Sequence, residues 1–296
     1  MTDRGHSGGD PMGGLIRPKF SQIDAWGLTH RGMVREDNQD HFFVGALARG
    51  VTVDATSIDE QGRSVLHAER LASLAMVADG VGGRRGGEEA ARTAVQELIS
   101  RVSESFHDAE HDQSEDPEAF SRLLHDAALA CHESLLQKAE RAGGERKFST
   151  TLTLFLGLWP EAYLLQVGDS RCYILRDGEL TQITRDQTLA QVLVDQGSLT
   201  QTVANKSRWA DVLSSSIGGD EAAPVVTRVT RDWGNVVLLC SDGLTKHVSD
   251  EQIKSRLSSM SDARSSCELL VQDALDDGGT DNVTVIVGRA MRSDGL

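Results

Sequence analysis

The sequence predicts an α+β protein in which antiparallel sheets are covered by helices. Apolar segments of strand length and amphipathic segments of helix length come in separate blocks along the chain, whereas a doubly wound parallel sheet requires a regular alternation of the two. An Asp-Gly pair at 177–178 separates two strand-like segments, as in a β-hairpin. With 39% hydrophobic and 25% charged residues, the 296-residue chain is long enough for one large domain or two small ones.

The first part of the chain favours strands. Residues 1–20 are rich in Gly and polar residues, and we expect them to form a disordered extension. Strands are expected at 23–30 and 40–47, with a charged segment between them. Residues 51–70 are less regular and indicate a hairpin or a loop insertion, and 71–79 reads as a fully buried strand.

Two helices are expected next. Residues 88–106 place apolar side chains at helical spacing, with two glutamates in the first turn, where the helix dipole favours acids. The acidic stretch 107–118 is expected to break this helix. A second helix is predicted over roughly 117–142, ending at the glycine pair 143–144.

The second half of the chain returns mainly to strands, with a mixed region over 186–222 that contains a Ser/Gly-rich loop. Short or moderate helices are predicted at 188–196, 249–258 and 261–275. Strands are predicted at 149–158, 162–169, 171–178, 179–184, 223–230, 235–242 and 282–289.

Charge and cysteine content narrow the function classes. The formal charge of 30 − 45 = −15 argues against nucleic-acid and anionic-membrane partners, which bind through Lys and Arg. The four cysteines form no CxxC pair and have no His at zinc-ligand spacing, and Cys172 and Cys240 lie in or beside apolar strands as free buried thiols do. No apolar run approaches the ~20 residues of a membrane helix, and no signal peptide is evident. We therefore expect a cytoplasmic protein.

Four acids stand where an apolar strand meets a loop. Asp79, Asp169 and Asp242 follow such strands, and Asp281 precedes one. Carboxylates that converge at one sheet edge raise one another's pKa, and a divalent cation relieves the repulsion. An all-oxygen set without His or Cys selects Mg²⁺ or Mn²⁺. The alternative is that each acid simply belongs to a turn in a structural β-sandwich, and four coincident matches weigh against it.

Six motifs, in order, resemble those of the metal-dependent Ser/Thr protein phosphatases of type 2C, the PPM family, particularly its compact bacterial members. They extend over nearly the whole chain, from about Ile23 to Arg289. The resemblance implies a four-layer α-β-β-α fold, with a central antiparallel β-sandwich between helices. It implies a single catalytic domain over 21–292, with an insertion at about 51–70 and a flap at about 196–218. The motifs are G-M-V-R-E-D-N-Q-D (32–40), D-G-V-G-G (79–83), S-T-T-L (149–152), G-D-S-R (168–171), S-D-G-L (241–244) and T-D-N-V-T (280–284).

The resemblance also assigns metal ligands. It implies that Asp79 bridges two Mn²⁺ or Mg²⁺ ions and that the Gly80 carbonyl contacts one of them. Asp242 and Asp281 would complete the coordination of one of these ions. Asp169 and Asp242 would together coordinate a third ion, which is bound more weakly.

Two residues of the first motif receive catalytic roles from the resemblance. Asp40 would hold metal-bound waters, and Arg35 would clamp the substrate phosphate through its bidentate fork. The implied reaction is hydrolysis of phosphoserine and phosphothreonine in proteins by direct attack of a metal-bridging water, without a covalent phosphoenzyme. The implied partners are phosphoproteins and a cognate Ser/Thr kinase, and we expect a monomer. The alternative is a catalytically idle phosphatase-like module that binds a phosphoprotein or kinase.

Some positions depart from the family pattern. Val81 stands where many eukaryotic relatives carry a His thought to protonate the leaving group, and Gln39 stands where some members place Glu. Lys206, Arg208 and Trp209 in the flap are candidates to contact a phosphopeptide, with solvated loop residues as the alternative.

Overall fold

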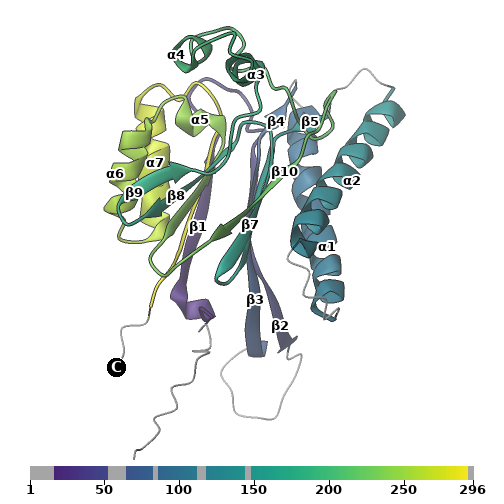
Figure 1. Ribbon diagram of the computed structural model, residues 1–296, viewed down its shortest axis with the longest axis vertical. Helices are drawn as coiled ribbons and strands as arrows, with labels where there is room; N and C mark the ends of the chain where they lie inside the picture. Colours follow the sequence, from purple (N-terminus) through teal and green to yellow (C-terminus); the bar gives the residue numbers. More distant parts are fainter. Residues whose placement is uncertain (1–16, 53–64, 83–85, 112–117, 144–147, 293–296) are drawn as a thin grey trace, which may run out of the picture.

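The computed structural model describes residues 17–52, 65–82, 86–111, 118–143 and 148–292, and the architecture below refers to them. Two five-stranded sheets pack face to face, and helices cover both outer faces (Figure 1). Neighbouring strands in both sheets pair antiparallel. The α+β class and the four-layer α-β-β-α arrangement are therefore confirmed.

The first sheet contains both the first and the last strand of the chain. The last strand lies between the first strand and β11, so Val287 is opposite both Trp26 and Leu238. In spatial order the strands are β1 (Ile23–His30), β12 (Val283–Ala290), β11 (Val236–Cys240), β8 (Arg171–Arg176) and β9 (Glu179–Gln182).

The second sheet is built from the middle of the chain. A separate two-stranded sheet pairs β4 (Gly80–Val81) with β5 (Ser149–Thr150) at the end of the sandwich where the second sheet's β3 terminates. The five strands in spatial order are β10 (Val225–Thr230), β7 (Glu161–Val167), β6 (Leu152–Leu158), β3 (Val65–Ala78) and β2 (His41–Thr52).

Three hydrophobic layers hold the four structural layers together. Helices α1 (Gly86–His111) and α2 (Ala119–Arg141) bury their apolar faces on the second sheet. Helices α6 (Asp250–Ser258) and α7 (Ala263–Asp276) do the same on the first sheet. The inner layer between the sheets is almost entirely aliphatic and aromatic, and includes Phe155.

The remaining helices are short. They are the 3₁₀ turn η1 (Phe20–Gln22) and the helices α3 (Leu189–Asp195), α4 (Gln201–Ala204) and α5 (Asp242–Thr245). The α3 N-terminus is capped by Thr188, whose hydroxyl accepts from the Gln191 N–H. Helices α3, α4 and α5 lie with β4 and β5 at the upper end of the sandwich in Figure 1.

Several boundaries differ from the sequence prediction. Helix α1 continues to His111, five residues into the acidic stretch expected to break it, and 112–117 lies outside the described residues. The strand predicted at 149–158 is interrupted at Thr151, where the chain passes from β5 to β6. At 51–70 the hairpin interpretation is correct for the described part, because β2 reaches Thr52 and β3 starts at Val65.

Two other sequence predictions concern the cysteines and the N-terminal extension. All four cysteines are buried and free, as expected for Cys172 and Cys240. The extension predicted over 1–20 lies outside the described residues up to 16, and Phe20 already begins η1. Within the described residues, no helix has the length and apolar character needed to cross a membrane.

Candidate active site

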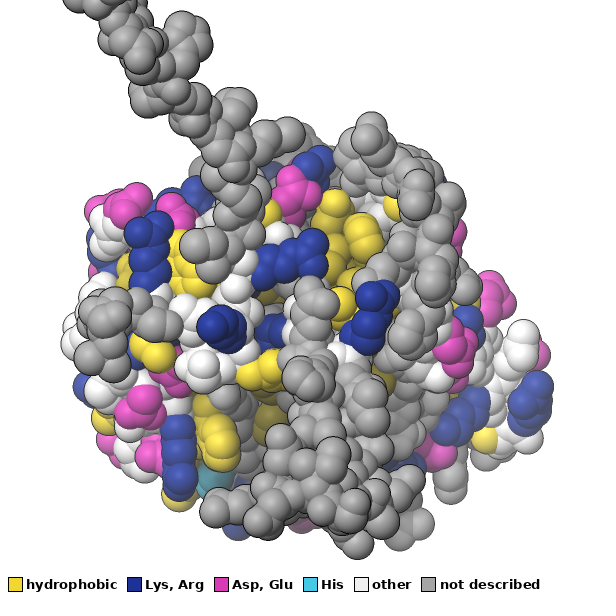
Figure 2. All heavy atoms as spheres, turned by 90° about the horizontal axis from the view of Figure 1, so that it is seen from below, with side chains coloured by type: hydrophobic (Ala, Val, Ile, Leu, Met, Phe, Trp, Pro, Cys, Tyr) yellow, Lys and Arg dark blue, Asp and Glu magenta, His cyan; other side chains and the backbone are white. Residues whose placement is uncertain are grey.

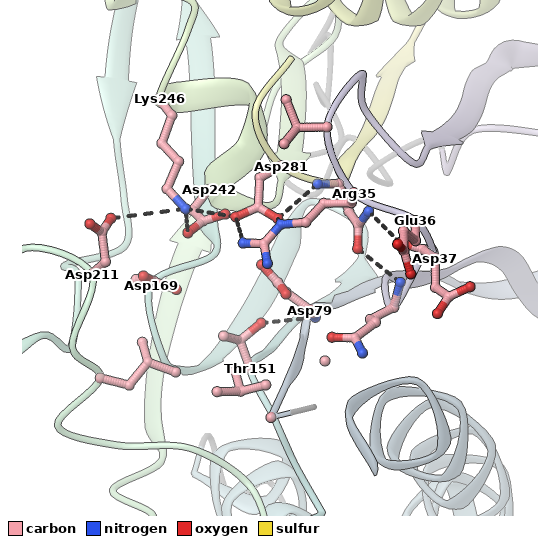
Figure 3. Close-up of a pocket in the computed structure, with 17 residues that line it drawn as sticks. Arg35, Glu36, Asp37, Asp79, Thr151, Asp169, Asp211, Asp242, Lys246 and Asp281 are labelled. Atoms are coloured by element: carbon pink, nitrogen blue, oxygen red, sulfur yellow. Dashed lines mark hydrogen bonds and ion pairs between the residues drawn. The ribbon is translucent and has the colours of Figure 1, made fainter. Parts of the chain in front are cut away.

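The four strand-end acids converge at one end of the sandwich. Asp79 follows β3 and Asp169 lies two residues after β7, both in the second sheet. Asp242 lies two residues after β11 and Asp281 two residues before β12, both in the first sheet. All four line one cleft of about 520 Å³ (Figure 3). The expected convergence is therefore observed, with two acids from each sheet.

The backbone around Asp79 is fixed by the strand that faces it. Its N–H donates to Thr151 Oγ1 at 3.0 Å, and its carbonyl accepts from the Thr151 N–H and the Thr150 hydroxyl, both at 2.9 Å. The next residue must be glycine, because a Cβ at Gly80 would overlap the carbonyl of Gly87 at the start of α1. The sequence D-G thus places a carboxylate at the cleft while a helix begins close behind it.

Asp169 is positioned by contacts between its loop and the segment 186–188. Gly168 has a positive φ of 103°, and its N–H donates to the Gln187 side chain at 2.8 Å. Arg171 forms a bidentate pair with Asp186, with Nε and Nη2 at 2.9 and 2.7 Å from the two carboxylate oxygens. The segment 186–188 therefore braces the strand end that carries Asp169.

Two basic side chains, those of Arg35 and Lys246, lie in the acidic cleft. The fork of Arg35 contacts both oxygens of Asp281, from Nε and Nη2 at 2.8 Å each. Lys246 Nζ lies 2.6 Å from Asp242 Oδ2 and 3.0 Å from Asp281 Oδ2. Figure 3 shows the two basic side chains reaching Asp281 from different sides. Arg35 was predicted at this site, whereas Lys246 was not. Its signal is the i,i+4 spacing from Asp242 on a short helix that sequence reading missed.

Asp40 lies behind the cleft rather than in its wall. It is 3% exposed, and its Oδ2 accepts from Ser241 Oγ at 2.8 Å and Thr284 Oγ1 at 2.6 Å. Its Oδ1 is buried without a hydrogen-bond partner. A buried carboxylate oxygen in this state is unfavourable unless a water or ion reaches it. The position therefore fits the role of supporting a metal-bound water.

The electrostatics of the cleft favour an added cation. Burial, together with neighbouring acids, raises the pKa of Asp79 and of Asp169 well above the ordinary value. Burial raises the pKa of Asp242 as well, and brings that of Asp40 to about 6. For Asp281, burial acts upward, but hydrogen bonds from Arg35 and the charge of Lys246 lower the pKa overall.

The donor set suits a hard divalent ion, although two of its carboxylates, those of Asp242 and Asp281, are paired with basic side chains. In the described part of the chain, no three His, Cys, Asp or Glu side chains already stand together as ligands of one ion. Arg35 and Lys246 hold the oxygens that such an ion would need. Asp242 Oδ1 is buried without a hydrogen-bond partner, like Asp40 Oδ1. With carboxylates and a glycine carbonyl as the donors at hand, the residues fit Mg²⁺ or Mn²⁺.

The flap contributes different residues from those expected. Asp211 and Leu213 line the cleft, and Asp211 Oδ1 lies 3.9 Å from Lys246 Nζ. The predicted contacts Lys206, Arg208 and Trp209 are not among the described lining residues, and Arg208 instead stacks on Trp209 at 4.4 Å. Where the flap lines the cleft, it therefore contributes one acidic and one apolar side chain.

The two departures from the family pattern, Val81 and Gln39, both lie at the cleft. Val81 lines it and brings an apolar side chain. Gln39 lines it as well, and its N–H donates to Asn282 Oδ1 at 2.9 Å, which ties the first motif to the last. Asn282 also donates from its amide to the carbonyls of Arg31 and Asp37. This one asparagine therefore holds the loop that presents Arg35 to the cleft.

Known proteins match this chain over most of its length. The protein phosphatase 2C family model matches residues 55–277. The Ser/Thr protein phosphatase PstP of Mycobacterium tuberculosis is 33% identical over 267 residues, covering 90% of this chain and 45% of PstP. The protein phosphatase PhpP of Streptococcus pneumoniae is 32% identical over 260 residues, covering 87% of this chain and 94% of PhpP.

The fold agrees with a solved structure of the same kind. The crystal structure of the PstP catalytic domain in complex with 2 manganese ions superposes with a TM-score of 0.70. It is 31% identical in sequence, and the match covers 91% of this chain and 99% of that domain. The chain spans about half the length of full-length PstP, the 45% given above, and corresponds to its catalytic domain. Taken with the six motifs and the acidic cleft, these matches show that the chain belongs to the protein phosphatase 2C family.

Proposed function

We propose that this chain is a metal-dependent phosphatase that hydrolyses phosphoserine and phosphothreonine in proteins. The observation that carries the proposal is one cleft lined by four strand-end carboxylates and by Arg35, whose fork holds one of them, Asp281. PstP is a Ser/Thr protein phosphatase whose catalytic domain has been solved with two manganese ions, and PhpP is a protein phosphatase. The catalytic domain would comprise residues 21–292 of a monomer.

The proposed ion ligands are the carboxylates of Asp79, Asp242 and Asp281, with the Gly80 carbonyl. Asp169 is proposed as a ligand of a third, weaker ion, and Asp40 would hold a metal-bound water. When bound, Mn²⁺ or Mg²⁺ would lower the pKa of water and offset charge on the phosphoryl oxygens. Lys246 now neutralises Asp242, so it has to yield at least one contact when an ion arrives.

The residues of this chain would then orient the phosphoester. Arg35 is 55% exposed, and its fork is held by the Asp281 carboxylate that an ion would take. Once released, a planar guanidinium can hold two phosphoryl oxygens at once. Val81 has no proton to give, so the leaving serine or threonine oxygen must be protonated by water or by another residue of the cleft.

The partners follow from the cleft and from the relatives. We propose phosphorylated proteins as substrates and a Ser/Thr kinase as the enzyme that generates them. The cleft wall carries Glu36, Asp37 and Asp211, so phosphopeptides with basic flanking residues should be preferred over acidic ones.

The experiment is phosphate release from phosphoserine, phosphothreonine and phosphotyrosine peptides, with Mn²⁺ and with EDTA. Hydrolysis of the first two in Mn²⁺, lost in Asp79→Asn, supports the proposal. Asp126→Asn is the matched control, because Asp126 is a 78% exposed side chain on α2. No release by the wild type, with tight binding of the phosphopeptide, would support the idle-module alternative instead.

A further inference from the structure

Two arginines at the far end of the sandwich are not paired with an acid among the described residues. Arg70 lies near the start of the described side chains of β3, and Arg231 directly follows β10. No carboxylate among the described residues pairs with either guanidinium, and the charge felt by Arg231 is that of Arg70. The chain has 45 acids against 30 basic residues. An unpaired arginine pair is therefore unexpected.

The contacts of the two guanidinium groups are mainly apolar. Arg70 Nη1 donates to Ser73 Oγ at 2.8 Å, and its guanidinium lies 4.8 Å from the ring centroid of Phe20. Arg231 lies 5.0 Å from the ring centroid of Phe155 and 5.5 Å from that of Trp159. The Nε of each arginine is buried without a hydrogen-bond partner. Both therefore keep hydrogen-bonding capacity that the described residues leave unused.

The electrostatic state of the pair is unfavourable in the absence of an anion. Burial lowers the pKa of Arg70, and burial together with Arg70 lowers that of Arg231 to about 10. An uncompensated charge removed from water is costly, and folded proteins usually pair it. An anion between the two side chains would relieve both the burial cost and the mutual repulsion.

A cavity adjoins the pair. It has a volume of about 390 Å³, within the size range of small-ligand sites. Both arginines line it, as does Arg289, which is already paired with Asp24. Figure 2 views this end of the molecule and shows Lys and Arg side chains among hydrophobic ones. The apolar lining comes from the inner faces of both sheets and includes Val44, Ala75, Phe155, Val237, Leu239 and Ile286.

The cavity is remote from the active-site cleft. Strand β3 carries Arg70 in its first half and leads into Asp79 at its C-terminal end. At ~3.3 Å per residue, the nine steps from Arg70 to Asp79 span about 30 Å. An anion at the arginine pair is thus a different ligand from the phosphoryl group in the cleft.

We propose that this cavity binds a small amphipathic anion, with a carboxylate or phosphate-like head between Arg70 and Arg231 and an apolar body between the two sheets. The head would accept charge-assisted hydrogen bonds from the two guanidinium groups. The apolar body would replace water against the aliphatic inner faces. This second site is independent of the proposed phosphatase reaction.

The test is calorimetric and thermal-shift titration of the whole chain in EDTA with four probes: octanoate, octylphosphonate, octanol and inorganic phosphate. The phosphonate resists hydrolysis, and the first two probes distinguish a carboxylate head from a phosphate-like one. At least one of these two should bind and raise the melting temperature. Arg231→Met and Arg70→Met should each weaken that binding about tenfold or more, since a charge-assisted hydrogen bond is removed. Arg228→Met is the matched control, because Arg228 pairs with Glu161 and does not line the cavity.

Stability without ligand separates a binding role from a structural one. If the role of Arg231 is to bind an anion, the melting temperature of Arg231→Met in EDTA should equal or exceed that of the wild type, because an unpaired buried charge is removed. Three results would overturn the proposal: no binding of either anionic amphiphile, equal binding of octanol or of inorganic phosphate, or undiminished binding in both cavity variants. A large fall in the melting temperature of unliganded Arg231→Met, with Arg70→Met binding as the wild type does, would likewise show a structural role.

Discussion

Replacing Lys246 by Met should make the protein bind Mn²⁺ more tightly. Lys246 Nζ lies within hydrogen-bond distance of both Asp242 and Asp281, and the side chain is only 28% exposed. An ion that takes these carboxylates must displace the ammonium or endure its repulsion. Methionine keeps most of the side-chain volume and removes the positive charge.

The size of the effect follows from the hydrogen bonds between the Lys246 ammonium and the two carboxylates. A hydrogen bond to a charged group contributes ~1.5–3 kcal/mol, and 1.4 kcal/mol corresponds to about tenfold in affinity. Breaking one such bond on metal binding therefore weakens the wild-type affinity by roughly ten- to a hundredfold relative to Lys246→Met. Without metal the order reverses, because Asp242 has no counter-charge in the variant. The variant should then be less stable by roughly 2 kcal/mol, or about 4–8 °C in melting temperature.

The assay is calorimetric titration with Mn²⁺, together with thermal unfolding in EDTA. Lys254→Met is the control, since Lys254 pairs with Glu179 on the surface and does not line the cleft. Weaker Mn²⁺ binding by Lys246→Met would refute the reasoning, because it would mean that the lysine helps to arrange the ligands rather than competing with the ion.

Three further predictions concern the same end of the molecule. In EDTA the protein should gain stability as the pH falls, because the buried Asp40 carboxyl has its pKa raised to about 6; the gain is full below the ordinary aspartate value and lost as the pH rises through 6. Melting curves of Asp40→Asn should show a flatter pH slope, and an unchanged slope would contradict this origin. Arg35→Gln should raise KM for phosphopeptides about tenfold or more, while calorimetry shows Mn²⁺ binding unchanged or tighter, since Asp281 is released; loss of metal binding would count against the phosphate role. Gly80→Ala should destabilise the fold by about 3 kcal/mol in denaturant unfolding through overlap with backbone, whereas Gly288→Ala, with a nearest contact of 3.4 Å, should cost far less.

Much of the fold can be predicted from the sequence, because buried strands and long helices each have a characteristic pattern of apolar residues. Residues 71–79 and 235–242 are largely apolar, and the structure places β3 and β11 there. Helices α4 and α5 have four residues each, too few to show a helical period. Sheet order is also absent from the local pattern, since nothing near Ile23 indicates that it pairs with Ala290.

The residues of the candidate site likewise differ in whether the local sequence can predict them. Asp79 and Asp242 could be predicted because each follows an apolar strand, where a carboxylate has no structural need to be. Lys246 could not, since its place in the cleft depends on the turn of α5. The burial of Asp40 depends on hydroxyls from two distant segments, Ser241 and Thr284, which come together only in the folded sheet.

The position of β12 sets when the cleft can exist during synthesis. This strand is the last of the described strands, yet it is inserted between β1 and β11 in the first sheet, with Asp281 just ahead of it. A nascent chain leaves the ribosome N-terminus first, so the segments bearing Asp40, Asp79 and Asp169 emerge long before their last partner. The acidic centre therefore stays incomplete until the segment that carries Asp281 and β12 has emerged.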